Sequence, residues 1–353
     1  MESFGFWYKL VEDKDDKNPE FDLHVNFWFL GDILKGKVKN PYLDIGIKIQ
    51  NYKNLSNLVF SFPFHVPQKN LVDLASKMSV KNNASIVFNE ECEIETQKEY
   101  TLIKIPGKEK TDDKKLLIFP LEQAVENIYE LTDYKEKSYI TVKFDEFRTY
   151  LKNSGSDLER YSDIYIRFRI QNIDLENILY FDSEPFNKSL DSAFSGTRVL
   201  DFKINEKRNI DKNITARMEQ KEELLVEFGQ IHFLVMEPSS YDMVSYTQNQ
   251  MSCRELEKDL WNEYLKVDLE DKFGHVLAYH WKKKASDQSK ISDFSCFAKI
   301  NYQKMQMKTV FATPLINTFS QRLSGGYNIV NLIMDLALAV VMIFIGWRVG
   351  RSK

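Results

Sequence analysis

The sequence predicts a mainly β protein with a few helices, arranged as two tandem β-sandwich-like domains and followed by one C-terminal transmembrane helix. Three observations carry this prediction: short segments in which apolar and polar residues alternate, a pattern that occurs twice, and one long apolar segment near the end of the chain. The 25 Phe and 17 Tyr agree with it, since aromatic residues are enriched in strands.

Residues 43–50 and 164–171 show the clearest alternation of an apolar residue with a polar or small one. A period of two with one polar face is typical of half-buried antiparallel strands. Further strands are expected at 21–30, 57–66, 84–96, 99–106, 115–119, 138–144, 177–183, 198–205, 226–237, 274–283, 294–303 and 307–313.

Helices are expected at 70–78, at 121–131 and after Ser252, where Ser252 and Glu255 have the spacing of a capping box. The last helix would turn an apolar face inward, made of Leu256, Leu260, Trp261, Tyr264 and Leu265. Residues 205–223 are polar and indicate a loop or a short helix.

The repeat aligns residues 47–60 with residues 168–181, with one gap. Both copies contain Ile-Gln-Asn, followed by a polar turn and an apolar strand. We interpret the repeat as a duplication that gives a first β-sandwich-like domain at 1–121 and a second at 122–322, the second with a C-terminal extension.

Charge is distributed unevenly along the chain. The net charge is −4, yet residues 280–353 contain eleven Lys and Arg against three Asp, which gives 11 − 3 = +8. The three cysteines lie far apart, so a disulfide framework is not expected and a reducing compartment is favoured. The N-terminus lacks the basic and apolar regions of a signal peptide.

The C-terminal helix is predicted over 327–348, and its apolar part from Ile329 to Trp347 is long enough to span about 30 Å of hydrocarbon. Polar and small residues form one stripe along it and suggest a helix interface or a pore, with an ordinary anchor as the alternative. The stripe consists of Asn328, Asn331, Asp335, Ala339, Gly346 and Gly350.

The cations before the helix indicate its orientation. Residues 280–322 carry eight cations and two acids, which favours a single-pass, tail-anchored protein whose large N-terminal region is cytoplasmic. Lys282, Lys283 and Lys284 are candidate contacts to anionic lipid. Nucleic acid is disfavoured as a partner because the rest of the chain is strongly acidic.

No motif indicates an enzyme, a cofactor or a metal site. The sequence contains neither GxGxxG nor GxxxxGK[ST], and the five histidines have no metal-ligand spacing. A Cys/His nucleophile pair finds no local support.

The function hypothesis is therefore a non-enzymatic, membrane-anchored protein. Its cytosolic β domains bind a partner or ligand, and its C-terminal helix self-associates into a homo-oligomer. In its strongest form this protein is a membrane-perturbing effector in cellular defence. The alternative is a passive tail-anchored scaffold that tethers a partner protein at the membrane.

Overall fold

The computed structural model describes residues 2–12, 18–29, 33–34, 37–38, 41–96, 100–107, 113–119, 128–153, 161–172, 178–182, 195–246, 251–266, 275–286 and 289–303. The chain divides into two compact units, one formed by Met1–Tyr180 with Val199–Ile300 and the other by Phe181–Arg198 with Asn301–Lys353. In the second unit, Thr197 Oγ1 donates a hydrogen bond of 2.9 Å to Asn301 Oδ1. The fold and the site described below belong to the first unit.

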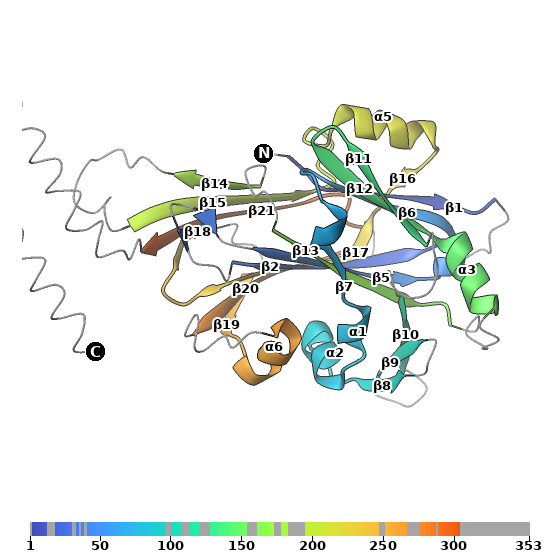
Figure 1. Ribbon diagram of the computed structural model, residues 1–353, viewed down its shortest axis with the longest axis horizontal. Helices are drawn as coiled ribbons and strands as arrows, with labels where there is room; N and C mark the ends of the chain where they lie inside the picture. Colours follow the sequence, from blue (N-terminus) through green and yellow to red (C-terminus); the bar gives the residue numbers. More distant parts are fainter. Residues whose placement is uncertain are drawn as a thin grey trace, which may run out of the picture. The chain divides into compact units, whose positions relative to one another are not determined.

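A ten-stranded sheet dominates the first unit (Figure 1). Its strand order is β19 (Met251–Glu255), β20 (Val276–Lys284), β17 (Phe228–Pro238), β2 (Glu20–Trp28), β5 (Tyr42–Gln50), β13 (Ile164–Gln171), β10 (Lys114–Phe119), β9 (Thr101–Ile105) and β8 (Glu93–Thr96), with β7 (Leu71–Asp73) also paired to β13. The β-rich prediction is confirmed, and the alternating segments at 43–50 and 164–171 are β5 and β13.

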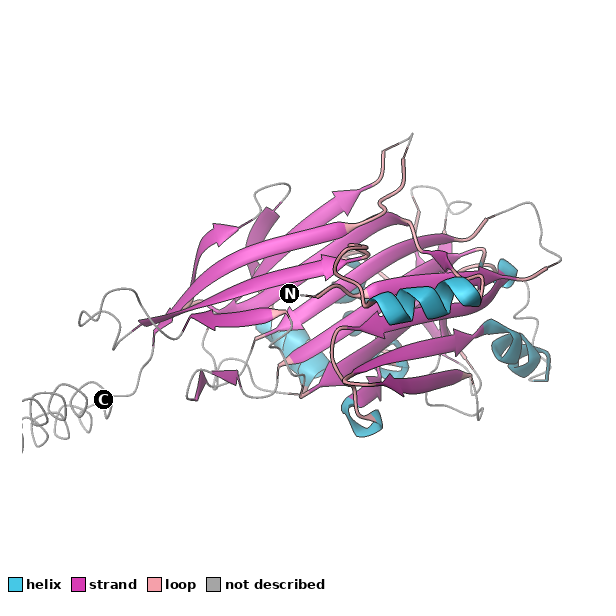
Figure 2. Cartoon of the chain, turned by 90° about the horizontal axis from the view of Figure 1, so that it is seen from above, coloured by secondary structure: helices cyan, strands magenta, loops and turns pink. Residues whose placement is uncertain are grey.

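A second sheet has five strands, in the order β11 (Tyr129–Tyr134), β12 (Lys137–Lys143), β6 (Leu55–Phe62), β1 (Gly5–Leu10) and β16 (Leu224–Leu225). Figure 2 looks down on this sheet, with the helix α5 (Lys212–Gln220) across its outer face. The other strands are β14 (Leu179–Asp182), β15 (Ser195–Ile204), β21 (Phe294–Gln303) and β18 (Asp242–Tyr246), which form a four-stranded sheet in that order, and the pair β3 (Ile33–Leu34) and β4 (Lys37–Val38).

Phenylalanines join the two large sheets in a β-sandwich-like arrangement. The Phe60 ring of β6 lies 5.3 Å from the Phe168 ring of β13, and Phe6 of β1 lies 5.5 Å from Phe228 of β17. Such edge-to-face pairs add to the free energy gained by burying each ring. Because side chains alternate along a strand, every second residue of β2, β5, β13 and β17 points into this core and the residues between them point to the opposite face.

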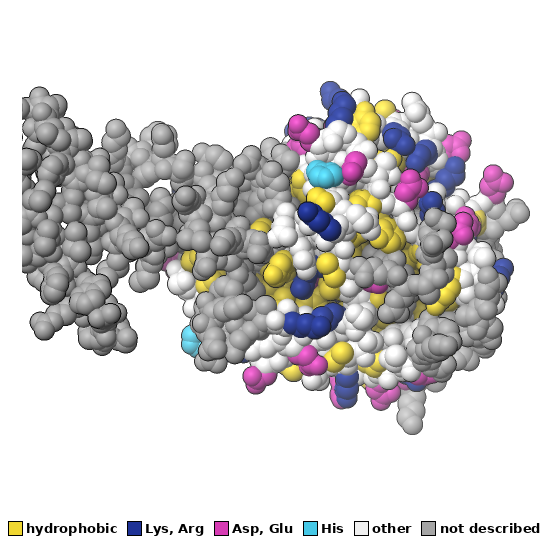
Figure 3. Space-filling view, viewed as in Figure 1, with side chains coloured by type: hydrophobic (Ala, Val, Ile, Leu, Met, Phe, Trp, Pro, Cys, Tyr) yellow, Lys and Arg dark blue, Asp and Glu magenta, His cyan; other side chains and the backbone are white. Residues whose placement is uncertain are grey.

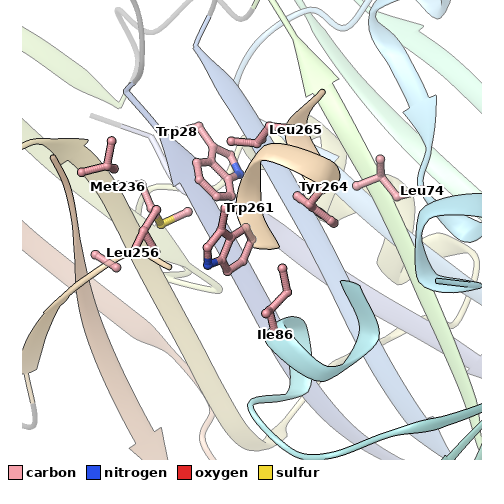
Figure 4. Close-up of a cluster of buried hydrophobic side chains, with 10 residues drawn as sticks. Trp28, Leu74, Ile86, Met236, Leu256, Trp261, Tyr264 and Leu265 are labelled. Carbon is pink, nitrogen blue, oxygen red and sulfur yellow. The ribbon is translucent and has the colours of Figure 1, made fainter. Parts of the chain in front are cut away.

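Helices α1 (Ala75–Met78), α2 (Lys81–Phe88) and α6 (Lys258–Leu265) cover that opposite face (Figure 1). Figure 4 shows Trp261 and Tyr264 of α6 among Trp28, Ile86 and Met236, in a cluster of buried side chains. The remaining helices are α3 (Phe144–Asn153) and two 3₁₀ turns, Tyr52–Asn54 and Gln68–Asn70.

Several expected elements differ from the structure. Ser252 and Glu255 belong to strand β19 and form no capping box, and α6 begins later, at Lys258. The inward face predicted for this helix is nonetheless correct for Leu256, Trp261, Tyr264 and Leu265, which are buried.

The stretch 84–96, expected as one strand, is the end of α2 followed by β8. Residues 129–131, expected in a helix, lie in β11. Helix α3 was not expected at all.

Strands from the two expected domains alternate within the same sheets. β13 pairs with β5, β12 pairs with β6, and β17 pairs with β2, so the boundary at 121/122 does not separate two sheets. The repeated segments also pair differently, since β2 pairs with β5 whereas β12 pairs with β6 and β11. The duplication and the domain boundary at 121/122 stay predictions.

One detail of the repeat is confirmed. Asn51 and Asn172, which follow β5 and β13, have left-handed φ values of 56° and 51°. Asn tolerates this conformation better than most residues, so both positions are turns at strand ends.

Among the described residues, no helix is long and apolar enough to cross a membrane. The predicted transmembrane helix at 327–348 lies outside the described residues.

Candidate functional site

The helix-covered face of the large sheet carries a buried ionic cluster centred on Asp44 of β5. The Asp44 carboxylate accepts hydrogen bonds from Arg169 Nε at 2.6 Å and Arg169 Nη2 at 2.9 Å. It also accepts one from Tyr264 at 2.8 Å and one from Trp28 Nε1 at 3.1 Å. Arg167 Nη2 lies 3.7 Å from the same carboxylate. These four partners come from β2, β13 and α6, so the cluster joins the helix to the sheet.

The cluster has a surplus of positive charge. Burial alone would raise the pKa of Asp44, but the guanidinium groups of Arg169 and Arg167 outweigh it and hold that pKa below its usual value. The carboxyl is therefore ionised and balances one of the two cations. The side chains of Asp44 and Arg167 are fully buried, so the remaining positive charge lies in the interior, where it is weakly screened.

A pocket of about 460 Å³ opens beside this cluster. It lies on the same face of the large sheet, where β2, β17 and β20 run side by side and α2 approaches them. Its polar and charged lining residues are Asp22, His24, Asn26, Lys48, Asn89, Glu90, Lys114, Gln230, His232, Ser252, Arg254, His280 and Lys282. The apolar and aromatic ones are Ile86, Val87, Phe88, Ile105, Leu234, Trp261 and Ala278.

Three histidines from three strands lie together in this pocket, namely His24, His232 and His280. We call it the three-histidine pocket. His24 and His232 are register partners on the parallel strands β2 and β17, with ring centres 5.1 Å apart. His232 Nδ1 lies 2.9 Å from His280 Nε2, and the two rings are stacked. The register of β17 against β2 and β20 thus places the histidines in a row across the sheet.

Hydrogen bonds define which ring nitrogens carry protons. The amide of Gln230 donates to His232 Nε2, so the other nitrogen, Nδ1, carries the proton and donates to His280. Arg167 Nη1 donates to the Tyr165 hydroxyl at 3.1 Å, and this hydroxyl shares a hydrogen bond of 3.1 Å with His24 Nδ1. Among the described residues, Nδ1–H of His280 and Nε2 of His24 lie outside these chains, and both are available to a ligand.

Gly46 allows this arrangement. It lies beside His24 on β2 and beside Arg167 on β13. A Cβ atom at this position would meet the Tyr165 hydroxyl at 2.1 Å and Arg167 Nη1 at 2.9 Å. Only glycine leaves room for the Tyr165 hydroxyl that orients His24.

The histidines are neutral at pH 7. Burial is the main cause, and together with His280 and Lys282 it lowers the pKa of His232 to about 4. Burial, followed by Lys282 and Arg254, lowers the pKa of His280 to about 4 as well. Burial and the neighbouring cations hold the pKa of His24 well below its ordinary value.

Cations outnumber acids in the pocket. Lys48 lies 3.8 Å from Asp22, so these two charges compensate each other. Lys114, Arg254 and Lys282 are exposed and face a single further acid, Glu90. On the surface in Figure 3, in contrast, basic and acidic side chains are interspersed. The excess of cations in the pocket is therefore a local feature.

Comparisons with known proteins give no family for this chain. Neither a family model nor a curated protein matches it. Among solved structures, the chain is similar to the Fcho1 Mu homology domain of Danio rerio with a bound Eps15 peptide, with 8% identity over 82% of this chain and 79% of that chain. The TM-score of 0.15 is too low for this similarity to carry an argument about fold or function.

The site residues expected from the sequence fall into two groups. The stripe of Asn328, Asn331, Asp335, Ala339, Gly346 and Gly350 lies outside the described residues. The lysines 282–284 are at the end of β20. Lys282 lines the pocket, and Lys283 donates a hydrogen bond of 3.0 Å to the Asp293 carbonyl. Contact of these lysines with anionic lipid stays a prediction.

The strands expected from the sequence include His24, His232 and His280, but the sequence did not indicate that these residues lie close together. His275 and His280 are separate in the structure, since His275 bonds to Glu255 and His280 to His232. Among the described residues, no set of three or more His, Cys, Asp or Glu side chains is arranged to hold a metal ion. The described part of the pocket instead offers mainly hydrogen-bond donors, which suit an oxygen-rich ligand.

Proposed function

We propose that the protein is a non-enzymatic, membrane-anchored binding protein that holds a ligand or partner in the three-histidine pocket. The observation that carries this proposal is the pocket itself, with its convergent donors on a rigid sheet and its apolar wall. Pockets of about 300–1,000 Å³ with this mixture are typical ligand sites. Membrane anchoring, the other part of the proposal, is supported by the long apolar segment at 327–348.

Binding is favoured over thiol chemistry by the state of the cysteines. Burial raises the pKa of Cys92 to about 11 and also raises the pKa values of Cys253 and Cys296. A nucleophilic cysteine needs a lowered pKa, because the thiolate is the reactive form. Among the pocket-lining residues that the structure describes, there is no cysteine beside the three histidines.

Membrane attachment is tested by removing residues 324–353 and separating cell membranes from cytosol by sedimentation. The full chain should sediment with membranes, and the shortened chain should stay in the supernatant. Sedimentation of the shortened chain with membranes would show that the remaining residues bind lipid without the predicted helix.

Self-association of the helix is tested by Asp335→Leu, with Ile343→Leu as the control on the opposite face. Loss of an acid from the predicted span should improve insertion by about 2–3 kcal/mol, while loss of the expected polar contact should reduce cross-linking between copies. Concurrent loss of dye leakage from vesicles would support a membrane-perturbing effector. Unchanged cross-linking and leakage would favour the alternative, a passive scaffold that tethers a partner at the membrane.

A further inference from the structure

We propose that the three-histidine pocket binds a small organic phosphate, and that binding is accompanied by the uptake of one proton by the hydrogen-bonded pair His232 and His280. This inference rests on the proposed binding role of the same pocket and names the class of its ligand. It concerns the described residues of the first unit only.

The hydrogen-bonding groups of the pocket select an acceptor. The groups available in the described part of the pocket are Nδ1–H of His280, Nε2 of His24 and the side chains of Lys114 and Lys282. Arg254 also lines the pocket, and its Nη1 donates to Asn89 Oδ1 at 3.2 Å, which leaves its other N–H groups for a ligand. Trp261 adds a further donor, since its buried Nε1–H has no hydrogen-bond partner among the described residues. A ligand rich in oxygen acceptors satisfies these donors, whereas a cationic ligand would leave them unpaired.

The charge of the pocket favours phosphate over a single carboxylate. Four Lys and Arg side chains line it against two acids, Asp22 and Glu90, which leaves 4 − 2 = 2 positive charges. The buried surplus of the Asp44 cluster adds to this field, and Arg167 is among the charges that act on His24. A phosphate monoester carries about −1.5 to −2 charge at pH 7 and three acceptor oxygens, which matches this surplus.

The shape of the pocket requires an organic body as well as the anion. A cavity of about 460 Å³ is much larger than a phosphate group. Phe88, Trp261 and Leu234 form part of its wall, and aromatic rings offer stacking surface for a flat apolar group. A free small molecule is favoured over a lipid headgroup because several donors lie on the sheet, under the helices that cover this face.

Protonation follows from the same geometry. In the free protein His232 and His280 are neutral because they are buried beside cations. A bound anion within about 4–6 Å favours the charged form and raises a pKa by about 1–3. The charged and titratable groups around these two rings in the pocket are Asp22 and His24 of β2, Lys48 of β5, Lys114 of β10, Arg254 of β19, Lys282 of β20 and Glu90 after α2. Tyr165 and Arg167 of β13 act on the neighbouring His24.

The sign of the effect is fixed by linkage. Where the bound form holds more protons than the free form, affinity rises as the pH falls. If the anion raises the pKa of one histidine by about 2, from about 4 in the free protein, affinity at pH 7 should be about tenfold weaker than at pH 5.

The test uses the purified full chain in detergent and two fluorescent probes, 1-naphthyl phosphate and 1-naphthyl sulfate. The sulfate keeps one charge from pH 5 to pH 8, so its pH dependence reports the protein alone. We expect both probes to bind, and the sulfate to bind about tenfold more tightly at pH 5 than at pH 7.

Three variants locate the site. Lys282→Gln changes an exposed residue and should weaken binding of both probes about tenfold. His280→Phe should weaken binding at pH 5 more than at pH 7. His275→Phe is the matched control, because His275 lies next to the same strand but bonds to Glu255 outside the pocket; it should bind like the parent.

Four results would overturn the inference: no binding of either probe at pH 5, binding that Lys282→Gln and His280→Phe leave unchanged, sulfate binding that is equal at pH 5 and pH 7, or binding only to vesicles that contain phosphatidic acid or only to an oligoglutamate peptide. The first three results do not bear on the sedimentation test, so failure of this inference and failure of membrane anchoring are distinguishable. Binding only to vesicles would also appear in that test, as sedimentation of the shortened chain with membranes.

Discussion

Replacing Asp44 by Asn should destabilise the protein strongly. The substitution keeps the size of the side chain but removes the only carboxylate that faces the Arg167 and Arg169 guanidinium groups in the cluster as described. The new amide nitrogen would also point a donor at groups that are themselves donors, namely Arg169, Tyr264 and Trp28. Two buried cations would then lack a counter-charge.

Breaking a buried ion pair by removing one partner costs about 3–5 kcal/mol. Typical stabilities are about 5–15 kcal/mol, so this is a large part of the total. The measurement is urea denaturation of the full chain in detergent, followed by tryptophan fluorescence. Trp28 donates to Asp44 and its ring lies 5.1 Å from that of Trp261, so the signal reports the cluster directly.

Glu130→Gln is the matched control for Asp44→Asn. It is also a strand carboxylate, 3.2 Å from Lys143, but 58% of its side chain is exposed. Exposed ion pairs contribute about 0–1 kcal/mol, so the control should unfold nearly as the parent does. If Asp44→Asn fell within about 1 kcal/mol of the control, the account of the cluster as a strongly coupled buried ion pair would be wrong.

Two further predictions concern packing and pH. Gly46→Ala should lower the free energy of unfolding by about 1–3 kcal/mol, because the new methyl group meets the Tyr165 hydroxyl at 2.1 Å; an unchanged denaturation midpoint would contradict the close approach. Asp211 caps α5 by accepting from the backbone N–H groups of Asn213 and Ile214, so Asp211→Ala should cost about 1 kcal/mol at pH 7. Burial opposes the charge on Asp211, but hydrogen bonds from Lys137 and these N–H groups lower its pKa to about 2. Its contribution is therefore complete above about pH 4 and is lost as the pH falls towards 2, so parent and Asp211→Ala should converge in acid denaturation.

The sequence was sufficient to predict strands and the faces that carry their apolar residues, but not their partners. The half-buried state expected for 164–171 was wrong, because Tyr165, Arg167 and Arg169 on the polar face of β13 are buried too. The alternation at 43–50 and 164–171 correctly placed the apolar side of β5 and β13 in the core. A period of two determines which face a side chain lies on, and nothing in it specifies the neighbouring strand. The similar alternation of β5 and β13 therefore did not indicate that these two strands are antiparallel neighbours in one sheet.

Helix α3 could have been found from the sequence. Phe144, Phe147 and Leu151 are buried at spacings of three and four, and Asp145 and Glu146 lie in the first turn. Helix α2 was harder to predict, because Ile86, Val87 and Phe88 favour strands when considered alone. Packing of Ile86 against α6 in the buried cluster overrides that preference.

The pocket could not have been predicted from spacing, because its residues are far apart in the sequence. His24 and His232 are brought together only by the parallel register of β2 and β17. The alternation within each strand was informative. Each histidine occupies a polar position, and these positions lie on the face of the sheet away from the phenylalanine core. What the sequence lacked was the order of the strands, which depends on long-range pairing.

The buried ionic cluster and the three-histidine pocket share one network of hydrogen bonds. Arg167 lies 3.7 Å from the Asp44 carboxylate, and its Nη1 holds the Tyr165 hydroxyl that orients His24 in the pocket. Stability alone does not explain why two buried arginines face one carboxylate. A protein in which hydrophobic residues replace a buried ion pair is often as stable. The surplus charge is useful if an anion binds beside it, because the ligand then supplies the missing negative charge. On this argument the buried arginines and the neutral histidines form one anion-binding arrangement: the arginines provide a fixed field, and the pair of His232 and His280 takes up a proton when the ligand binds.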